Sequence, residues 1–296
     1  MFLYMKHTIS IITINYNNAA RLRDTIASVV NQDYPHVEYV VIDGGSTDGS
    51  VDVIKSNSNS ISYWISEKDT GVYNAMNKGI AVATGDYIIF LNSGDVFIDQ
   101  QVVSKCCQEV KESAQADILY GNILVANPLN EINRPHDHPK NLTLRFFKND
   151  TINHQASLIK RTLFREFGLY PECYKSASDC WLYIISLLAN KTYQYLDFQI
   201  VIYDFTGMSA VDNFKAYRAE QTQIWEILVP EYAKQLILEV EQLESHVTNY
   251  RHTVDYYHHI ANYKIVKTAI NLNSSFQKFK DKILGSDLMH DDLQNN

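Results

Sequence analysis

Three aspartates of this chain, Asp43, Asp69 and Asp95, each follow a short apolar run and stand among small polar residues. The run before Asp95, residues 87–91, is the clearest, because it ends abruptly in Asn-Ser-Gly-Asp. Such a run is typical of a buried strand, with an ordinary turn as the alternative to a site behind it. In open α/β sheets, however, ligands bind at the carboxyl ends of strands. Carboxylates beside small residues suit a hard divalent cation and the phosphates that it carries.

The elements that must position these aspartates alternate along the chain. Apolar runs predict strands and helical patterns follow them, in this order: strand 9–14, helix 18–32, strand 37–42, strand 61–65, helix 72–83 and strand 87–91. Short strands that alternate with helices predict a mostly parallel sheet built from βαβ units. The loops after parallel strands meet at one edge of the sheet, so we expect the three aspartates to gather there.

Two histidines lie in a region that the sequence predicts to be irregular. The pattern beyond residue 100 predicts a helix over 100–113, a strand over 117–120 and a proline-rich loop over 127–140. His136 and His138 fall in this loop, either as metal ligands or as residues of a solvated segment.

Asp179 opens the last helix predicted in this half, which runs to Leu188. Ser178 before it is a good N-cap residue, and Asp179 falls in the first turn. One interpretation is that its carboxylate only complements the helix dipole. His154 lies upstream, and a buried histidine with one structural hydrogen bond is an equally open interpretation of it.

The composition describes a folded protein that does not target nucleic acid. The 296 residues are 46% hydrophobic and carry a net charge of −8, which argues against a nucleic-acid partner. The four cysteines form no CxxC pair, which argues against zinc binding and a disulfide framework, and we expect reduced thiols in a cytoplasm. No run reaches the roughly 20 apolar residues that a membrane span needs. We therefore expect a cytoplasmic protein, with contact to the inner face of a membrane as an option.

Five ordered segments resemble those of family 2 glycosyltransferases, over about residues 8–210. The segments are 10–17 (SIITINYN), 41–50 (VIDGGSTDGS), 69–79 (DTGVYNAMNKG), 83–86 (ATGD) and 90–95 (FLNSGD). The residues of these segments are similar to those of bacterial enzymes that build surface polysaccharides. The resemblance implies the GT-A fold and inverting transfer of a sugar from a nucleotide-sugar, expected to be UDP-linked, to a glycan or lipid-linked acceptor.

The resemblance also implies roles for single residues. Asp179 would be the general base, and Asp95 would hold Mg²⁺ or Mn²⁺, with His154 beside the metal or the acceptor. Asp43 would accept a hydrogen bond from the nucleobase, Tyr16 would pack near the base, and Asp69 would contact the nucleoside or order the metal side. The donor-binding set is completed by Asn17, Asn77 and Lys78.

The chain departs from the family pattern at two places. The usual metal motif is Asp-x-Asp, whereas Asn92 to Asp95 keeps one carboxylate, which predicts modest metal affinity. Met76 stands where many relatives have arginine, and Lys78 would supply the missing charge. Because the metal motif keeps only one carboxylate, a second function stays open, that of a catalytically weak partner subunit. A dinucleotide-binding dehydrogenase is excluded, because it needs GxGxxG after the first strand.

The sequence predicts two domains, a catalytic domain over 1–212 and a helical region over 213–296. Apolar residues recur at alternating spacings of three and four from Val240 to Ala261. This heptad pattern predicts a two-stranded coiled coil and hence a homodimer, or packing against the catalytic domain. Residues 263–284 are basic and aromatic, which suits a membrane surface or a solvated helix.

Overall fold

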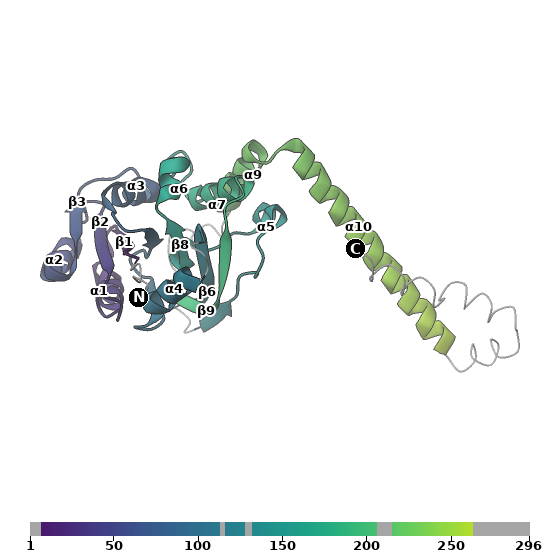
Figure 1. The fold of residues 1–296 in the computed structure, drawn as a ribbon, viewed down its shortest axis with the longest axis horizontal. Helices are drawn as coiled ribbons and strands as arrows, with labels where there is room; N and C mark the ends of the chain where they lie inside the picture. Colours follow the sequence, from purple (N-terminus) through teal and green to yellow (C-terminus); the bar gives the residue numbers. More distant parts are fainter. Residues whose placement is uncertain (1–6, 113–115, 128–131, 206–214, 263–296) are drawn as a thin grey trace, which may run out of the picture. The chain divides into compact units, whose positions relative to one another are not determined.

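A computed structural model describes residues 7–112, 116–127, 132–205 and 215–262 of the chain (Figure 1). The chain divides into two compact units, Met1–Pro230 and Glu231–Asn296. The first unit therefore extends beyond the boundary at residue 212 that the sequence predicts. Among the described residues, none of the helices is long and apolar enough to cross a membrane.

Four parallel strands form one half of the sheet, as predicted. In chain order this half consists of β1 (Ile9–Asn15), α1 (Ala19–Val30), β2 (Val37–Asp43), α2 (Ser50–Ser56), the short helix η1 (Ser58–Ser60), β3 (Tyr63–Ser66), α3 (Val72–Val82) and β4 (Tyr87–Phe90). The strands lie in the order β3-β2-β1-β4, and each adjacent pair is parallel. Their carboxyl ends therefore share one edge, where the sequence predicts the site.

Helices cover both faces of this parallel half (Figure 1). Ile11 and Val41 belong to the core that α1 and α2 close, whereas Ile12 faces α3. A Cβ on Gly79 of α3 would lie 2.5 Å from Ile12 Cγ2, so only glycine lets the helix approach this closely. Strands that are buried on both faces are mostly apolar, which is why β1, β2 and β4 are readable from the sequence. Strand β3, at the edge of the sheet, is only partly buried but has an apolar run as well.

The second half of the sheet is mixed. It contains β5 (Val96–Phe97), β6 (Ile118–Asn127), β7 (Ile132–His136), β8 (Ser157–Lys160) and β9 (Tyr193–Asp204). The sheet continues from β4 in the order β8-β6-β9-β5, with β7 paired to β6. The loop predicted over 127–140 thus contains a strand. Pro135 is tolerated there because β7 pairs with β6 alone, and an edge strand does not need every N–H.

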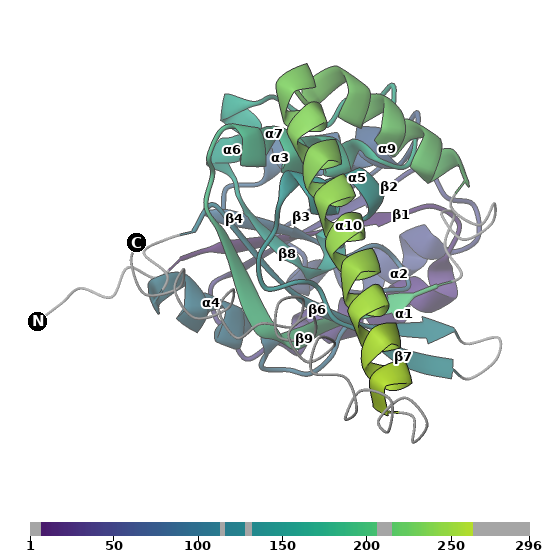
Figure 2. The same cartoon turned by 90° about the vertical axis from the view of Figure 1, so that its right-hand side faces the viewer.

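Further helices pack around this half. They are α4 (Val102–Glu112), α5 (Leu144–Asn149), η2 (His154–Ala156), α6 (Thr162–Glu166), α7 (Ser178–Leu188) and α9 (Lys215–Leu228). Helix α9 contacts both α5 and α7, and the two views show α7 and α9 side by side (Figures 1 and 2). This packing explains why α9 belongs to the first unit.

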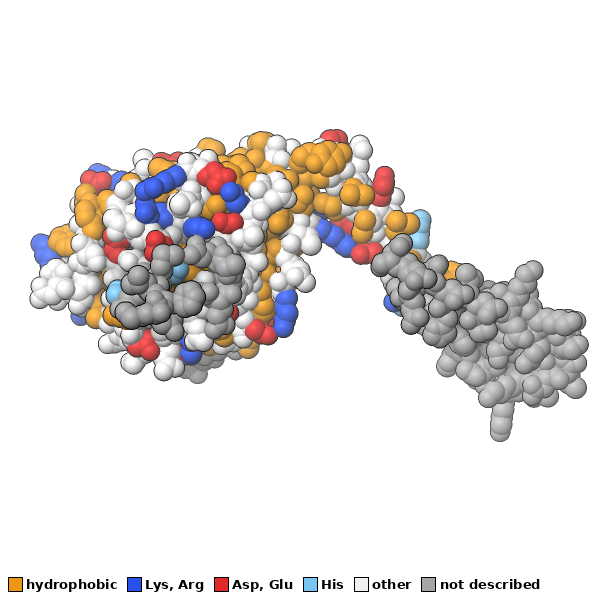
Figure 3. Space-filling view, in the orientation of Figure 1, with side chains coloured by type: hydrophobic (Ala, Val, Ile, Leu, Met, Phe, Trp, Pro, Cys, Tyr) orange, Lys and Arg blue, Asp and Glu red, His pale blue; other side chains and the backbone are white. Residues whose placement is uncertain are grey.

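The described part of the second unit is one long helix, α10 (Glu231–Asn262). Apolar side chains stand exposed along it, as the space-filling view shows (Figure 3). The exposed fraction is 59% for Leu236, 62% for Leu243, 52% for Val247 and 65% for Tyr250. The side chains of the later heptad positions, and all of the basic segment 263–284, lie outside the described residues.

Candidate active site

An aromatic ring and a carboxylate meet over a glycine at the predicted edge. A Cβ on Gly44 would lie 2.4 Å from Asp69 Oδ2 and 3.2 Å from Tyr16 Cδ2. Tyr16 is 66% exposed, so its ring is available to a ligand. The Asp69 carboxylate is oriented by the N–H of Gly71, which donates to Oδ1 over 3.0 Å. A planar ring with a nearby acceptor suits a nucleoside, and the Gly44 backbone forms the floor between them.

Asp43 is fully buried, and protein groups occupy its carboxylate. Asn15 Nδ2 and Ser46 Oγ donate to Oδ1 over 2.7 and 2.6 Å, while Ser46 N and Ser66 Oγ donate to Oδ2 over 2.9 and 2.6 Å. Burial alone would raise the pKa of Asp43, but these hydrogen bonds outweigh it and lower the pKa. Four bonds fill the usual acceptor capacity of a carboxylate. In this structure, Asp43 therefore shapes the loop around Gly44, and a contact from Asp43 to a nucleobase stays a prediction.

Asn17 holds the first loop against the second. Its N–H donates to Ser46 Oγ over 2.7 Å, and its Oδ1 accepts from Thr47 N over 2.9 Å. It adopts a left-handed conformation with φ of 50°, which asparagine tolerates better than most residues. Asn17 thus fixes the loop that carries Tyr16.

Asn77 and Lys78 connect loops as well. Asn77 is buried and pairs with the backbone of Tyr170, donating to its carbonyl over 2.9 Å and accepting from its N–H over 3.0 Å. Lys78 Nζ lies 2.8 Å from Glu67 Oε1 and donates to the Lys68 carbonyl over 3.0 Å. Lys78 therefore holds residues 67–68, directly before Asp69, and Asn77 holds Tyr170, upstream of Asp179.

Asp95 lies in a buried turn that α1 holds in place. Thr25 Oγ1 donates to the Asp95 carbonyl over 2.9 Å and accepts from Gly94 N over 2.9 Å. Burial raises the pKa of Asp95 to about 7, although the nearby His154 and a hydrogen bond from Gln155 act in the opposite direction. Asp95 Oδ1 accepts from the Asp204 N–H over 2.9 Å. The hydrogen bonds and the nearby histidine thus offset only part of the free-energy cost of burying this charged carboxylate.

The oxygens near Asp95 fit a hard cation. Asn92 Oδ1 is buried and has no hydrogen-bond partner among the described residues. The carboxylate of Asp95 and the unpaired amide oxygen of Asn92 are ligand types that Mg²⁺ and Mn²⁺ accept. The part of the chain that the structure describes contains no cluster of three His, Cys, Asp or Glu side chains able to hold a metal. Any cation here would depend on phosphate oxygens or water for its other ligands.

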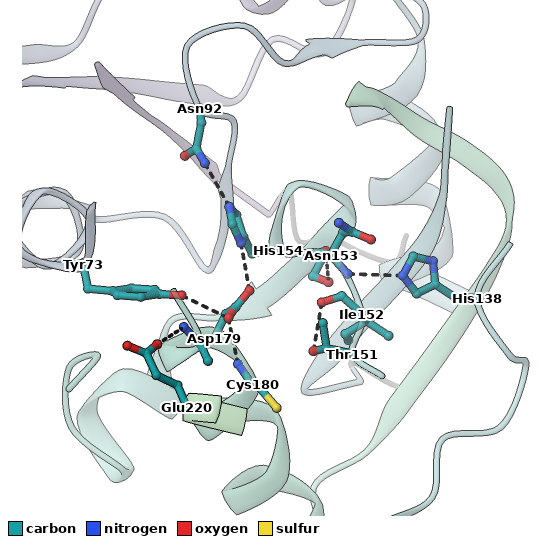
Figure 4. Close-up of polar contacts among 12 residues, drawn as sticks. Tyr73, Asn92, His138, Thr151, Ile152, Asn153, His154, Asp179, Cys180 and Glu220 are labelled. Carbon is teal, nitrogen blue, oxygen red and sulfur yellow. Dashed lines mark hydrogen bonds and ion pairs between the residues drawn. The ribbon is translucent and has the colours of Figure 1, made fainter. Parts of the chain in front are cut away.

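His154 bridges the turn after β4 and the start of α7 (Figure 4). Asn92 Nδ2 donates to His154 Nε2 over 3.1 Å, so the ring proton sits on Nδ1 and points to Asp179 Oδ2 at 3.0 Å. The interpretation of His154 as a buried residue with one structural bond is too simple, because both ring nitrogens are engaged. The predicted base and the predicted metal turn are therefore parts of one network.

Asp179 is buried and receives two more hydrogen bonds. Tyr73 OH and the Cys180 N–H donate to Oδ1 over 3.1 and 2.9 Å. Burial raises the pKa of Tyr73 well above its ordinary value, so the phenol keeps its proton and remains a donor. Ser178 is not the N-cap that the sequence predicts: Ala177 holds that position, and Ser178 Oγ donates to the Pro171 carbonyl over 2.6 Å.

His138 is neither solvated nor part of a metal cluster among the described residues. It is 3% exposed, and its Nε2 accepts from the N–H of Asn153, the residue before His154, over 3.2 Å. Burial, with His136 nearby, lowers the pKa of His138 to about 4. A neutral imidazole therefore anchors the segment that carries His154.

Several residues of the site have no role in the sequence prediction. Tyr73 belongs to the segment 69–79, but the sequence assigns no role to it. Its place one helical turn after Asp69 is the feature from which a role could have been predicted. Asp204 ends β9, pairs with Arg21, and has Oδ2 2.8 Å from the position of a Gly94 Cβ. No local pattern marks Asp204, because the sequence does not predict β9.

Comparisons with known proteins identify the family. Residues 10–171, more than half of the chain, match the family described as Glycosyl transferase family 2. An uncharacterized glycosyltransferase of Mycobacterium tuberculosis is 35% identical over 176 residues, which cover 58% of this chain and 66% of that protein, just under two thirds of its length. A PGL/p-HBAD biosynthesis glycosyltransferase of Mycobacterium bovis is 29% identical over 207 residues, covering 69% of this chain and 78% of that one.

Two solved structures share the fold. TarS of S. aureus in complex with UDP-GlcNAc aligns with a TM-score of 0.64 at 19% identity, covering 78% of this chain and 70% of that one. The mannosyltransferase PcManGT of Pyrobaculum calidifontis, in complex with GDP-Man and Mn²⁺, aligns with a TM-score of 0.61 at 15% identity, covering 90% and 84%. At these identities the likeness concerns the fold alone. The fold and the family match agree: the chain belongs to glycosyl transferase family 2.

Proposed function

We propose that this protein transfers a sugar from a nucleotide-sugar, UDP-linked by preference, to a hydroxyl of a glycan or lipid-linked acceptor, with inversion at the anomeric carbon. The observation that carries the proposal is the bridge of His154 between Asp179 and Asn92. It joins a candidate base on α7 to the turn that contains Asp95, so proton removal and leaving-group stabilisation can occur side by side.

Asp179 acts as the general base in this proposal. The acceptor O–H gives its proton to the Asp179 carboxylate while its oxygen forms the bond to the anomeric carbon. The bond from that carbon to the diphosphate breaks, and its electron pair leaves with the nucleoside diphosphate. Tyr73 and His154 donate to Asp179 and hold its orientation. A positioned base of this kind contributes roughly 10²–10⁴-fold to a rate.

Asp95 and the amide oxygen of Asn92 are the groups that would hold Mg²⁺ or Mn²⁺. The cation supplies positive charge against the leaving diphosphate. Arg21 lies near this turn but is paired with Asp204, so its charge is partly compensated. The chain carries a net charge of −8, and an anionic donor then favours binding together with a cation.

Tyr16 and Asp69 are the proposed contacts to the nucleoside. A UDP-GlcNAc complex exists for TarS, which supports a uridine nucleotide. The relative from Mycobacterium bovis is named for PGL/p-HBAD biosynthesis, which supports a biosynthetic role, and we extend this to surface polysaccharide synthesis.

Helix α10 is proposed to pair with a second copy of itself. Its exposed seam repeats with heptad spacing, with Val240 and Val247 at a positions and Leu243 at a d position. In a parallel pair, Glu239 would face Glu244 of the partner. In an antiparallel pair, Glu244 faces Arg251 of the partner instead, and the charges attract. The sequence thus favours an antiparallel homodimer.

Release of nucleoside diphosphate tests the function. The full chain is incubated with a panel of UDP-, GDP- and TDP-sugars and a glycan acceptor, with Mn²⁺ or with EDTA. We expect release with one donor and Mn²⁺, and a product whose anomeric configuration, read by NMR, is inverted. A donor that binds without release under every condition would support the alternative, a catalytically weak partner subunit.

A further inference from the structure

Glu220 of α9 binds the backbone directly before α7. Its Oε1 accepts from Lys175 N over 2.7 Å, and its Oε2 accepts from Ser176 N and Ala177 N over 2.8 and 3.1 Å. Ser176 Oγ also donates to Oε2, over 3.0 Å. One carboxylate therefore holds three consecutive N–H groups (Figure 4 shows Glu220 beside this turn).

This contact fixes the chain directly before the first turn of α7. Ala177 occupies the N-cap position of α7 and has no side-chain acceptor, and the Ser178 hydroxyl is committed to Pro171. Glu220 binds the N–H groups of the N-cap residue and of the two residues before it, and a negative charge near a helix N-terminus is favourable. Because Asp179 is the second residue of α7, the position of its carboxylate depends on this contact.

Gln221, the next residue of α9, holds the other side of the site. It is buried, and its Nε2 donates to the carbonyls of Phe147 and Asp150 over 3.2 and 2.8 Å. These carbonyls end α5 and lead into the segment that carries His154. Two adjacent side chains of α9 thus fasten the segments before Asp179 and before His154.

We propose that Glu220 and Gln221 are positioning residues, and that α9 is part of the catalytic apparatus because it sets the geometry of the Asp179–His154 pair. The inference rests on the proposed role of Asp179 as base. It assigns a function to a helix that the sequence places outside the catalytic domain.

The test uses Glu220→Gln in the full chain, because this change keeps the shape but turns one acceptor oxygen into an NH₂ group that faces backbone donors. Cys180 reports the first turn of α7. It is buried, and burial raises the pKa of its thiol to about 12, so a maleimide labels it slowly in the closed state. We expect at least about tenfold faster labelling of Cys180, read by mass spectrometry, since releasing residues 175–177 from Glu220 lets the first turn of α7 open more often. Labelling of Cys106 and Cys107, which are buried on α4, should stay unchanged.

Turnover gives a second readout. Displacement of a catalytic group by about 1 Å can cost on the order of 10²-fold, so kcat of Glu220→Gln should fall 10- to 100-fold while the affinity for the nucleotide, measured by calorimetry, is kept. Glu226→Gln is the matched control, because it removes the same charge from an exposed position on α9. It should match the wild type in both readouts.

The outcomes separate this inference from the proposed function. Cys180 labelling and kcat at wild-type levels in Glu220→Gln would overturn the inference, whereas a fully active Asp179→Asn would overturn the base assignment instead. If all buried cysteines of Glu220→Gln label faster, this variant is destabilised as a whole. The milder variant Ser176→Ala then tests the positioning role, since it deletes only one hydrogen bond to Glu220. Faster labelling of Cys180 alone in that variant supports the positioning role, and unchanged labelling refutes it.

Discussion

At the scale of residues, the carboxylates of Asp43, Asp95 and Asp179 differ in their surroundings and therefore in their roles. Four donors saturate Asp43, so it organises a loop. Asp95 is buried, and its hydrogen bonds and His154 do not offset the burial, so its pKa is raised to about 7. Asp179 accepts hydrogen bonds from the Tyr73 phenol and the His154 imidazole. Sequence alone places these aspartates at the ends of elements, but their roles follow from donor counts that depend on tertiary packing.

Replacement of Asp95 by alanine should abolish the part of donor binding that depends on metal. The variant loses the one carboxylate of the motif, and the charge that it provides to a cation is worth several kcal/mol in the transition state. Calorimetric titration of UDP with and without Mn²⁺ measures this. Asp95→Ala with an undiminished Mn²⁺ effect would contradict the assignment.

Removal of the Tyr73 hydroxyl should lower turnover. Tyr73 OH donates to the Asp179 carboxylate over 3.1 Å, so Tyr73→Phe removes one of the hydrogen bonds that orient the base, and kcat should fall by about 3- to 30-fold. The affinity for the nucleotide, measured by calorimetry, should stay at the wild-type value. A kcat at the wild-type level would show that the hydroxyl does not act on the base.

At the scale of elements, burial decides what the sequence reveals. Strands β1, β2 and β4 are largely buried, and the edge strand β3 is only partly buried. All four contain short, mainly apolar runs, so their positions and the edge that carries Tyr16, Asp69 and Asp95 could be predicted. Strand β9 alternates irregularly between partly buried and buried positions, and β7 contains a proline; neither has a clear strand pattern. Glu220 and Gln221 could not be found, because their partners lie more than 40 residues away.

The segment before His154 should carry a pH-dependent part of the stability. Folded His138 has a pKa lowered to about 4 by burial and by His136, whereas an unfolded histidine titrates near 6.5. Between these values the unfolded state binds a proton that the folded state does not, so the stability present above pH 6.5 falls as the pH drops toward 4.

For a shift of this size, the contribution of His138 is roughly 2 kcal/mol smaller at pH 5 than at pH 7. Urea unfolding of the wild type and of His138→Gln at both pH values isolates it, because glutamine keeps an acceptor but does not titrate. Equal pH dependence in the two proteins would refute the assignment.

At the scale of the whole molecule, the chain joins a catalytic unit to a helix with an exposed seam. Burial of Val or Leu contributes about 1.5–3 kcal/mol per side chain, so glutamates at Leu243 and Val247 together should abolish pairing of α10. Light scattering should give a dimer for the wild type and a folded monomer for this double variant. Ser245→Glu with His252→Glu adds the same charges at outward heptad positions and should remain dimeric.

A wild type that scatters as a monomer at micromolar concentration would rule out the homodimer. A double variant that is less stable but unchanged in assembly would indicate that the seam packs within one chain.

The most direct test of the whole account is the turnover of Asp179→Asn with its donor and acceptor. The amide keeps the size of the side chain but cannot take the acceptor proton, so kcat should fall by roughly 10²–10⁴-fold. The affinity for the nucleotide should stay at the wild-type value, because Asp179 contacts Tyr73, His154 and its own helix, away from Tyr16 and Asp69. Turnover at the wild-type rate, or an equal loss of binding and turnover, would contradict the role of Asp179 as the base.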